Sequence, residues 1–167
     1  EFDLRPKNLN LSALIQGFYD STSNLMIPDT ITARIIGTSV DVTDKAVIGT
    51  DGKCYFSFIP NGSLTNERPF LLQITHRNSI ETWLENSFMF TSSEANIDFM
   101  TLSDEVLGEN VIKVDNSPVR FAIFGGDINQ DDAVDLTDVI TVFNSASDFV
   151  TGYNLSDVTG NNLVDLT

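Results

Sequence analysis

The chain has 167 residues, of which 41% are hydrophobic, and its mean hydropathy is close to zero. This composition is typical of a soluble globular protein, and no stretch reaches the roughly eighteen apolar residues of a membrane span. The formal net charge is −15 with no basic stripe, which argues against nucleic acid as a partner. The single cysteine, Cys54, excludes an internal disulfide and a cysteine-based zinc site.

Residues 1–124 are predicted to form an antiparallel, Ig-like β-sandwich. Apolar residues occupy every second position, as on strands with one buried face, at residues 9–15, 31–35, 54–58, 70–74, 88–90, 97–99, near 111 and at 121–123. Turn signals such as Ile27-Pro28-Asp29, Asp51-Gly52 and Asn61-Gly62 separate these segments. About eight strands and twelve Phe residues, most of them in strand segments, favour a sandwich filled by aromatic side chains.

Residues 125–167 are predicted to form a separate small α module. They contain eight Asp and no Glu, Lys or Arg, so the segment repels itself and cations are its natural partners. Gly125-Gly126 is the predicted hinge. A helix of about three turns is expected after it, capped by Thr137 or Asp138, with Gly152 in the return. Its apolar positions recur at spacings of three and four: Leu136, Val139, Ile140, Phe143 and Ala146.

Residues 127–138 place oxygen-bearing side chains at positions 1, 3, 5, 9 and 12 of a twelve-residue loop. These residues are Asp127, Asn129, Asp131, Asp135 and Asp138, and Ala133 at position 7 offers its backbone carbonyl. Ca²⁺ takes six to eight oxygen ligands on a tight, EF-hand-like loop, so this spacing predicts a calcium site. The alternative is a surface turn in which Asp and Asn side chains bind nearby backbone amides.

Thirty residues later the motif recurs as Asp157-Val158-Thr159-Gly160-Asn161-Asn162-Leu163-Val164-Asp165-Leu166-Thr167. The duplicated loop-helix arrangement resembles a type I dockerin, a calcium-binding module. This resemblance, which covers residues 125–167, implies that Val134 and Val164 anchor each loop to its twin. It also implies a second ligand set formed by Asp157, Thr159, Asn161 and Asp165, with Leu163 as the carbonyl donor.

Three features depart from the dockerin pattern. Loop position 6, where the family has a left-handed glycine, is Asp132 or Asn162, and these residue types tolerate that conformation best after glycine. The pairs that often contact a cohesin partner are Leu136-Thr137 and Leu166-Thr167, without the usual two hydroxyls. The carboxylate that closes the second loop is expected one position after Thr167. Either further chain supplies it, or a neighbouring copy does so through Glu1-Phe2-Asp3, which would build a head-to-tail filament.

Two further segments resemble parts of bacterial surface proteins. The hairpin at residues 49–58 is similar to one in transthyretin-like and other Ig-like domains. Residues 76–83 are similar to a stretch found in secreted β-sandwiches ahead of dockerin-like tails, with no activity attached. His76, the only histidine, is expected to be packed or hydrogen-bonded, because no nucleophile is marked as its partner. The aromatic residues Tyr19, Tyr55 and Trp83 belong to the core or rim, or form a platform for sugars.

The sequence therefore predicts a non-catalytic, extracellular or cell-surface module for adhesion or assembly. Calcium orders its acidic part, and other protein modules or copies of itself are its partners. Chelation is expected to melt residues 125–167 while the sandwich stays folded. The alternative is a carbohydrate-binding module of a secreted polysaccharide-degrading enzyme, with glycans as ligands. A hydrolase is disfavoured, because calcium binding already explains the carboxylates that occur at interpretable spacing.

Overall fold

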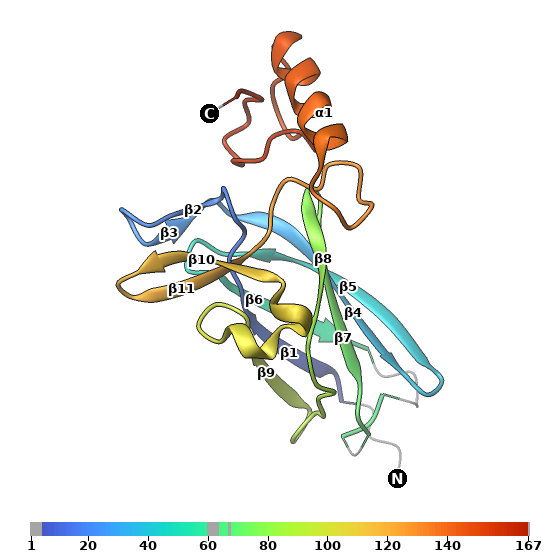
Figure 1. The fold of residues 1–167 in the computed structure, drawn as a ribbon. Helices are drawn as coiled ribbons and strands as arrows, with labels where there is room; N and C mark the ends of the chain where they lie inside the picture. The colour runs from blue at the N-terminus through green and yellow to red at the C-terminus, as the bar shows by residue number, and fades with distance from the viewer. Residues whose placement is uncertain (1–4, 60–63, 67, 167) are drawn as a thin grey trace.

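The computed structural model describes residues 5–59, 64–66 and 68–166. A β-rich body is followed by one helix and an irregular tail (Figure 1). The strands are β1 (Lys7–Ser12), β2 (Tyr19–Asp20), β3 (Leu25–Met26), β4 (Asp29–Gly37), β5 (Val40–Ile48), β6 (Lys53–Phe58), β7 (Leu71–His76), β8 (Ser79–Trp83), β9 (Glu94–Asp98), β10 (Val111–Asn116) and β11 (Val119–Ile123). Two 3₁₀ turns, η1 (Ser103–Glu105) and η2 (Leu107–Glu109), precede β10, and α1 (Leu136–Ser147) is the helix.

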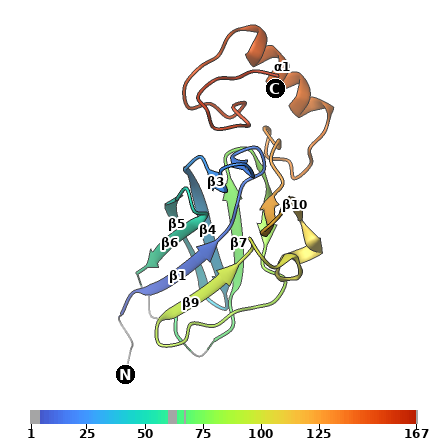
Figure 2. The same ribbon diagram turned by 90° about the vertical axis from the view of Figure 1, so that its left-hand side faces the viewer.

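Two sheets form the sandwich. One has the antiparallel order β5-β4-β7-β8, and the other has the order β6-β1-β9. Within the second sheet β1 pairs antiparallel with β6 but parallel with β9, so the predicted antiparallel arrangement holds for every named pair except this one. Figure 2 shows β1 and β9 in front of β4 and β5. The hairpins β2-β3 and β10-β11 complete the β structure.

The space between the sheets is filled by the alternating apolar residues that the sequence pattern predicts. Along β6 every second residue is buried, and the same alternation runs along β1. Phe70, Phe88 and Phe90 pack together with ring centroids 5.3 to 6.1 Å apart. Removing a large aromatic side chain of this kind from water contributes about 1.5–3 kcal/mol to stability. The seven buried Phe residues of the described sandwich therefore supply much of its driving force for folding.

Some predicted strands differ from the observed ones. Strand β5 was not predicted from the sequence because it lies at a sheet edge. Between its two buried ends, Val40 and Ile48, exposed residues alternate with only partly buried ones. Strand β8 also lacks a clear alternation. Residues 88–90 form no strand; Phe88 makes a single antiparallel bridge with Phe70. The predicted turn Asn61-Gly62 lies outside the described residues.

Helix α1 forms where the apolar spacing predicts it, but its cap is a different residue. Asp135 is the N-cap and accepts a hydrogen bond from the Thr137 amide, while Asp138, at the third helical position, accepts one from the Asp135 amide. This reciprocal pair is a capping box. The predicted caps, Thr137 and Asp138, are instead the first-turn residues that complete it.

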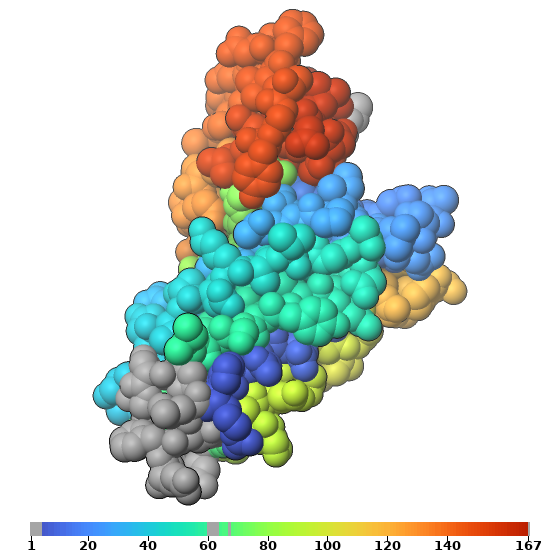
Figure 3. Space-filling view, turned by 180° about the vertical axis from the view of Figure 1, so that it is seen from behind, coloured from blue at the N-terminus to red at the C-terminus, as the bar shows by residue number. Residues whose placement is uncertain are grey.

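The acidic tail rests on one end of the sandwich (Figures 1 and 3). The predicted hinge is held tightly on the sandwich side. The Gly126 amide donates to the Asn78 carbonyl at 2.6 Å, and a Cβ atom on Gly125 would lie 2.8 Å from the Gln16 carbonyl oxygen. Gly125-Gly126 is therefore a close contact between the two parts rather than an open linker.

Candidate metal-binding loops and their junction with the sandwich

The first loop is closed by hydrogen bonds from backbone amides to two buried carboxylates. Asp127 accepts from the Asp131 amide and the Asp132 amide, each at 3.1 Å. Asp138, eleven positions along the loop, accepts from the Ile128 amide at 2.7 Å. The first and last positions of the predicted calcium loop are thus brought to its interior, where they are 1% and 2% exposed.

The remaining predicted ligands of the first loop lie nearer to solvent. The Asn129 side-chain amide donates to Asp131 at 2.7 Å, and Asp131 accepts from the Ala133 amide at 3.2 Å. Asp135 is occupied as the helix cap. These are the bonds of an Asx-type turn, so the carboxylates here bind backbone amides rather than converging on one point. In the part of the chain that the structure describes, no three Asp, Glu, His or Cys side chains form a group that could hold a metal ion.

Loop position 6 adopts the left-handed conformation that the sequence predicts. Asp132 has φ +67° and Asn162, its counterpart in the second copy, has φ +66°. Asp and Asn are the residues that replace glycine there at least cost. The two copies therefore share the sharp turn on which a calcium loop depends.

The interior of the first loop carries negative charge without a basic neighbour. Burial raises the pKa of Asp127, and the nearby Asp138 carboxylate adds to the rise. Burial also opposes ionisation of Asp138, but backbone amides of Asp135, Ile128 and Asn129 hold its pKa below the usual value. No Lys or Arg among the described residues forms an ion pair with either. An all-oxygen donor set of this charge suits a hard cation.

The second loop repeats the geometry of the first. Asp157 accepts from the Asn162 amide at 2.9 Å, five positions on, as Asp127 does from Asp132. Asn161 accepts from the Leu163 amide at 2.8 Å, as Asp131 does from Ala133. Thr159 donates its hydroxyl to Asp157 at 3.2 Å. Asp165 is partly buried and lies beside Asp138 and Val134 around a hollow of about 240 Å³.

The anchoring valines behave differently in the two copies. Val164 is 2% exposed, and its amide donates to the Val150 carbonyl at 3.0 Å. Val134 is 48% exposed. Only the second of the two predicted anchors is therefore buried. The segment Glu1-Phe2-Asp3, which the filament hypothesis uses to close the second loop of a neighbouring copy, lies outside the described residues.

A buried arginine joins the sandwich to the second loop. Arg77, in the turn between β7 and β8, donates from Nε to Asp29 Oδ2 at 2.7 Å, and its Nη2 lies 3.6 Å from Asp157 Oδ2. It also donates to the Asn154 carbonyl. The guanidinium lies over two aromatic rings, 5.3 Å from the centroid of Phe18 and 4.5 Å from that of Tyr153. One sandwich side chain therefore contacts the tail at three separate points.

The next residue, Asn78, extends this junction. Its side-chain amide donates to the Leu155 carbonyl at 3.2 Å and the Asp157 carbonyl at 2.9 Å. Two glycines permit the close approach. A Cβ atom on Gly17 would collide with the Val158 carbonyl, and one on Gly160 would collide with the Phe18 ring. We refer to Arg77, Asn78 and these two glycines as the junction.

His76 lies behind the junction in an arrangement that resembles a Ser-His-Asp triad. Its Nδ1 is 3.0 Å from Ser79 Oγ, and its Nε2 is 3.3 Å from Asp29 Oδ2. Ser79 is 1% exposed and sits inside the sheet, so a substrate carbonyl cannot reach its hydroxyl. The ring also packs edge-on against Phe18 at 5.1 Å. This geometry agrees with the packed, hydrogen-bonded histidine that the sequence predicts.

Sequence reasoning missed the residues that bind the loops to the sandwich. Arg77 and Asn78 fall within the segment 76–83, which the sequence marked by resemblance but could not explain. Gln130 lies at a loop position that carries no ligand signal in the sequence, yet its side-chain amide donates to the Ser79 and Asp127 carbonyls at 3.2 and 2.7 Å. Only the absence of a basic residue in the acidic tail signalled that a counter-charge must come from elsewhere.

No protein-family model matches this sequence, and no curated protein matches it either. Among solved structures, the chain is similar to one in the crystal structure of a type II Cohesin-X-Dockerin complex from Acetivibrio cellulolyticus, a C-terminal interface mutant. The two share 13% sequence identity with a TM-score of 0.52, over 95% of this chain and 87% of the other. At this identity the likeness shows the fold alone, and it supports an Ig-like β-sandwich. No helix among the described residues is long and apolar enough to cross a membrane.

Proposed function

We propose that this protein is a non-catalytic, extracellular interaction module whose acidic tail is a dockerin-like calcium-binding unit. The tail presents a surface to another protein module, and the sandwich holds that surface in place. The exposed apolar face of α1 is the single observation that carries this proposal. The similarity to a chain of a cohesin–dockerin assembly supports the sandwich fold of this proposal and no more than that.

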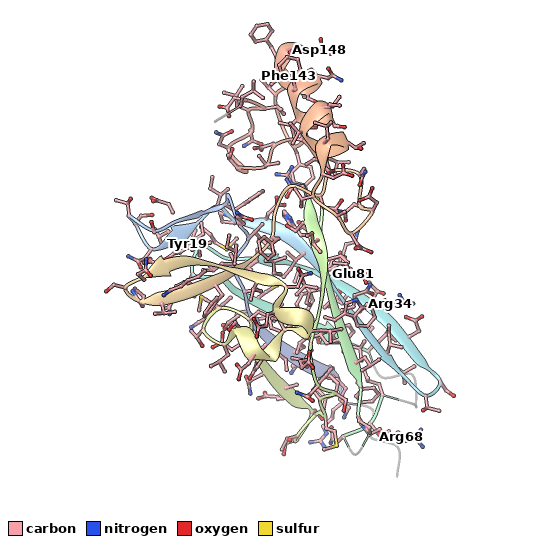
Figure 4. The ribbon with its side chains drawn as sticks, in the orientation of Figure 1. Tyr19, Arg34, Arg68, Glu81, Phe143 and Asp148 are labelled. Atoms are coloured by element: carbon pink, nitrogen blue, oxygen red, sulfur yellow. The ribbon has the colours of Figure 1, made fainter. Side chains whose placement is uncertain are left out.

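The apolar face of α1 points into solvent instead of packing on the sandwich. Its four large residues are each at least half exposed: Leu136, Val139, Ile140 and Phe143. Phe143 lies on the helix away from the sandwich (Figure 4). A helix whose apolar stripe is open to water is a typical protein-binding element, because an amphipathic helix gains stability by laying that stripe in a groove. The surrounding negative charge favours a partner with a basic rim.

Calcium in the first loop would hold this helix in position. The side chains of Asp127, Asn129, Asp131, Asp135 and Asp138 and the Ala133 carbonyl would be its ligands. The ion would supply the positive charge that the two buried carboxylates lack, and Asp135 and Asp138 also begin the helix. The second loop, with Asp157, Thr159, Asn161, Leu163 and Asp165, is a weaker candidate because it offers two carboxylates.

Calorimetry with calcium tests the proposed site. Asp127→Ala and Asp138→Ala are each expected to lower the affinity of the first loop by at least about a hundredfold, since each removes a carboxylate at a loop terminus. Asp148→Ala is the control, because it removes an acidic residue of the same tail from outside both loops. Equal calcium affinity in all three variants would contradict the assignment.

Binding assays test the interaction role. Phe143→Asp is expected to weaken capture of a protein partner from the source's extracellular fraction by about thirtyfold or more, as loss of a buried aromatic anchor does. Chelation by EGTA is expected to act in the same direction. Self-association is the other arrangement considered: light scattering that shows growth into filaments in calcium would make a second copy the partner.

Carbohydrate binding remains the second candidate, favoured by one feature of the three-stranded sheet. Tyr55 is 66% exposed and borders a groove of about 410 Å³ with Asn10 and Asn96. An aromatic face beside side-chain amides suits a neutral sugar. The predicted three-residue platform does not form, because Tyr19, Tyr55 and Trp83 belong to three different sheets. A glycan array comparing the native protein with Tyr55→Ala decides this candidate.

A further inference from the structure

The two loops bury equivalent carboxylates but neutralise them differently. Asp127 and Asp157 hold the first position of each loop, both are 1% exposed, and both accept the amide five residues on. Asp157 also faces the Arg77 guanidinium at 3.6 Å. Asp127 has no ion pair with a described basic residue. A buried carboxylate needs a compensating charge. In the second loop the Arg77 guanidinium provides that charge, and in the first loop no described side chain does.

Residues of the sandwich hold Arg77 in place. Asp29 accepts a hydrogen bond from its Nε at 2.7 Å, and the guanidinium lies 5.3 Å from the centroid of the Phe18 ring. On the tail side, the Tyr153 ring lies 4.5 Å from the guanidinium. The Arg77 side chain is 7% exposed. A guanidinium held this way keeps its charge and its direction, since it cannot be deprotonated in proteins and its planar group is preorganised.

We propose that Arg77 is the resident cation of the second loop and orders that loop without a metal ion. This inference rests on the proposed function in one respect, which is that the first loop binds calcium. The first loop relies on calcium for its counter-charge, whereas the second takes it from the sandwich. The positive charge beside Asp157 opposes a calcium ion at the same carboxylate, so the second loop binds calcium more weakly than its ligand pattern implies.

The placement of the second loop supports this role. Asn78 donates to the backbone carbonyl of Asp157, and Arg77 contacts the Asp157 carboxylate. The sandwich therefore holds both the backbone and the side chain of Asp157. Because Gly17 and Gly160 have no side chain, the backbone of the second loop comes close enough to the sandwich to form these bonds. The turn between β7 and β8 is thus a docking element for the second loop. This assigns a role to the segment 76–83 that its sequence alone does not reveal.

Amide hydrogen exchange on the full chain, in calcium and in EGTA, tests the proposal. In the native protein, EGTA is expected to reduce protection of the Asp131 and Asp132 amides by about tenfold or more, while the Gly160 and Asn162 amides change by less than about threefold. In Arg77→Met the second pair is expected to lose about tenfold with or without calcium. Arg34→Met is the matched control, because Arg34 forms an exposed ion pair with Asp41 elsewhere on the sandwich.

Three outcomes decide between the alternatives. Loss of protection at Gly160 and Asn162 in EGTA in the native protein would overturn the proposal, as would unchanged protection of these amides in Arg77→Met. If Arg77→Met does not fold, Arg77→Lys serves instead, since it keeps the charge but not the fork of donors. That variant should lose severalfold at the second loop, and no loss there would overturn the proposal. Absence of any calcium response at Asp131 and Asp132 would instead sink the proposed function.

Discussion

The sandwich and the acidic tail are held together by different physical effects. Most buried residues of the sandwich are apolar, and Phe70, Phe88 and Phe90 form one packed cluster. In residues 125–166 only Ile128 and Val164 are buried hydrophobic residues, and they are outnumbered by the buried polar ones. The sandwich is stabilised by apolar area removed from water, whereas the tail depends on carboxylates that bind backbone amides and on its contacts with the junction.

This difference has a consequence for folding. An apolar core of two residues cannot offset the conformational entropy of about forty ordered residues. The tail therefore depends on the sandwich for part of its order, and under the proposed function calcium supplies the rest. The sandwich needs neither of these, so it is expected to survive the removal of calcium.

The largest expected effect is on the core. Phe70→Ala should lower the free energy of unfolding by about 4 kcal/mol, because it leaves a cavity among three packed rings. Leu71→Ala, the neighbour on the other face of the strand and 46% exposed, should cost far less. Urea denaturation followed by circular dichroism measures both. Similar losses in the two variants would mean that the core is not where the structure places it.

The next largest effect concerns the buried carboxylate behind the junction. Although burial opposes ionisation, the neighbouring His76 ring and a hydrogen bond from Arg77 hold the pKa of Asp29 well below its usual value. A depressed carboxyl pKa contributes stability that is complete above the unfolded value of about 4 and is lost as pH falls through the folded value. Asp29→Asn should therefore cost about 3 kcal/mol at neutral pH and progressively less below pH of about 4.

Thermal unfolding at several pH values measures this effect. Asp41→Asn is the control, since Asp41 is paired with Arg34 on the surface, where its side chain is 57% exposed. An exposed pair of this kind contributes little to stability, because solvent screens the attraction between the two charges. A loss in Asp29→Asn that does not depend on pH would contradict the assigned charge state of Asp29.

A smaller effect separates backbone strain from docking. Gly152 and Gly160 both have positive φ, at +85° and +76°, but only a Cβ atom on Gly160 meets the Phe18 ring. Gly152→Ala should cost about 1–2 kcal/mol from strain alone. Gly160→Ala should cost at least about 1 kcal/mol more and should loosen the second loop from the sandwich. Equal stability losses, with equal exchange rates at Asn162, would show that the contact with Phe18 does not matter.

The smallest expected effect on stability is at the helix face. Phe143→Ser should change the free energy of unfolding by less than about 0.5 kcal/mol, because the ring is already 53% exposed. Val164→Ser, at a buried position of the same tail, should cost clearly more. A large loss in Phe143→Ser would show that the helix face is covered in solution. A second copy of the chain would then be the first partner to examine.

The local features of the fold could be predicted from the sequence because each depends on a short stretch of chain. Alternation with period two placed β1, β4, β6 and β7, and spacing of three and four placed α1. The left-handed turns at Asp132 and Asn162 followed from the loop register. Strand β5 was missed because an edge strand with polar residues on one face lacks the strong apolar alternation of a central strand.

The sequence by itself determined that two acidic loops of one pattern follow a β-rich body. Only the tertiary structure decided that those loops differ, because Arg77 lies eighty positions before Asp157 and meets it through the pairing of β7 with β8. It likewise decided that the apolar face of α1 stays open, since periodicity shows that a helix has an apolar side but not what covers it. Contacts between residues far apart in the chain leave no local pattern. Here such a contact gives Asp157 an arginine as its counter-charge, while Asp127 pairs with no described basic residue.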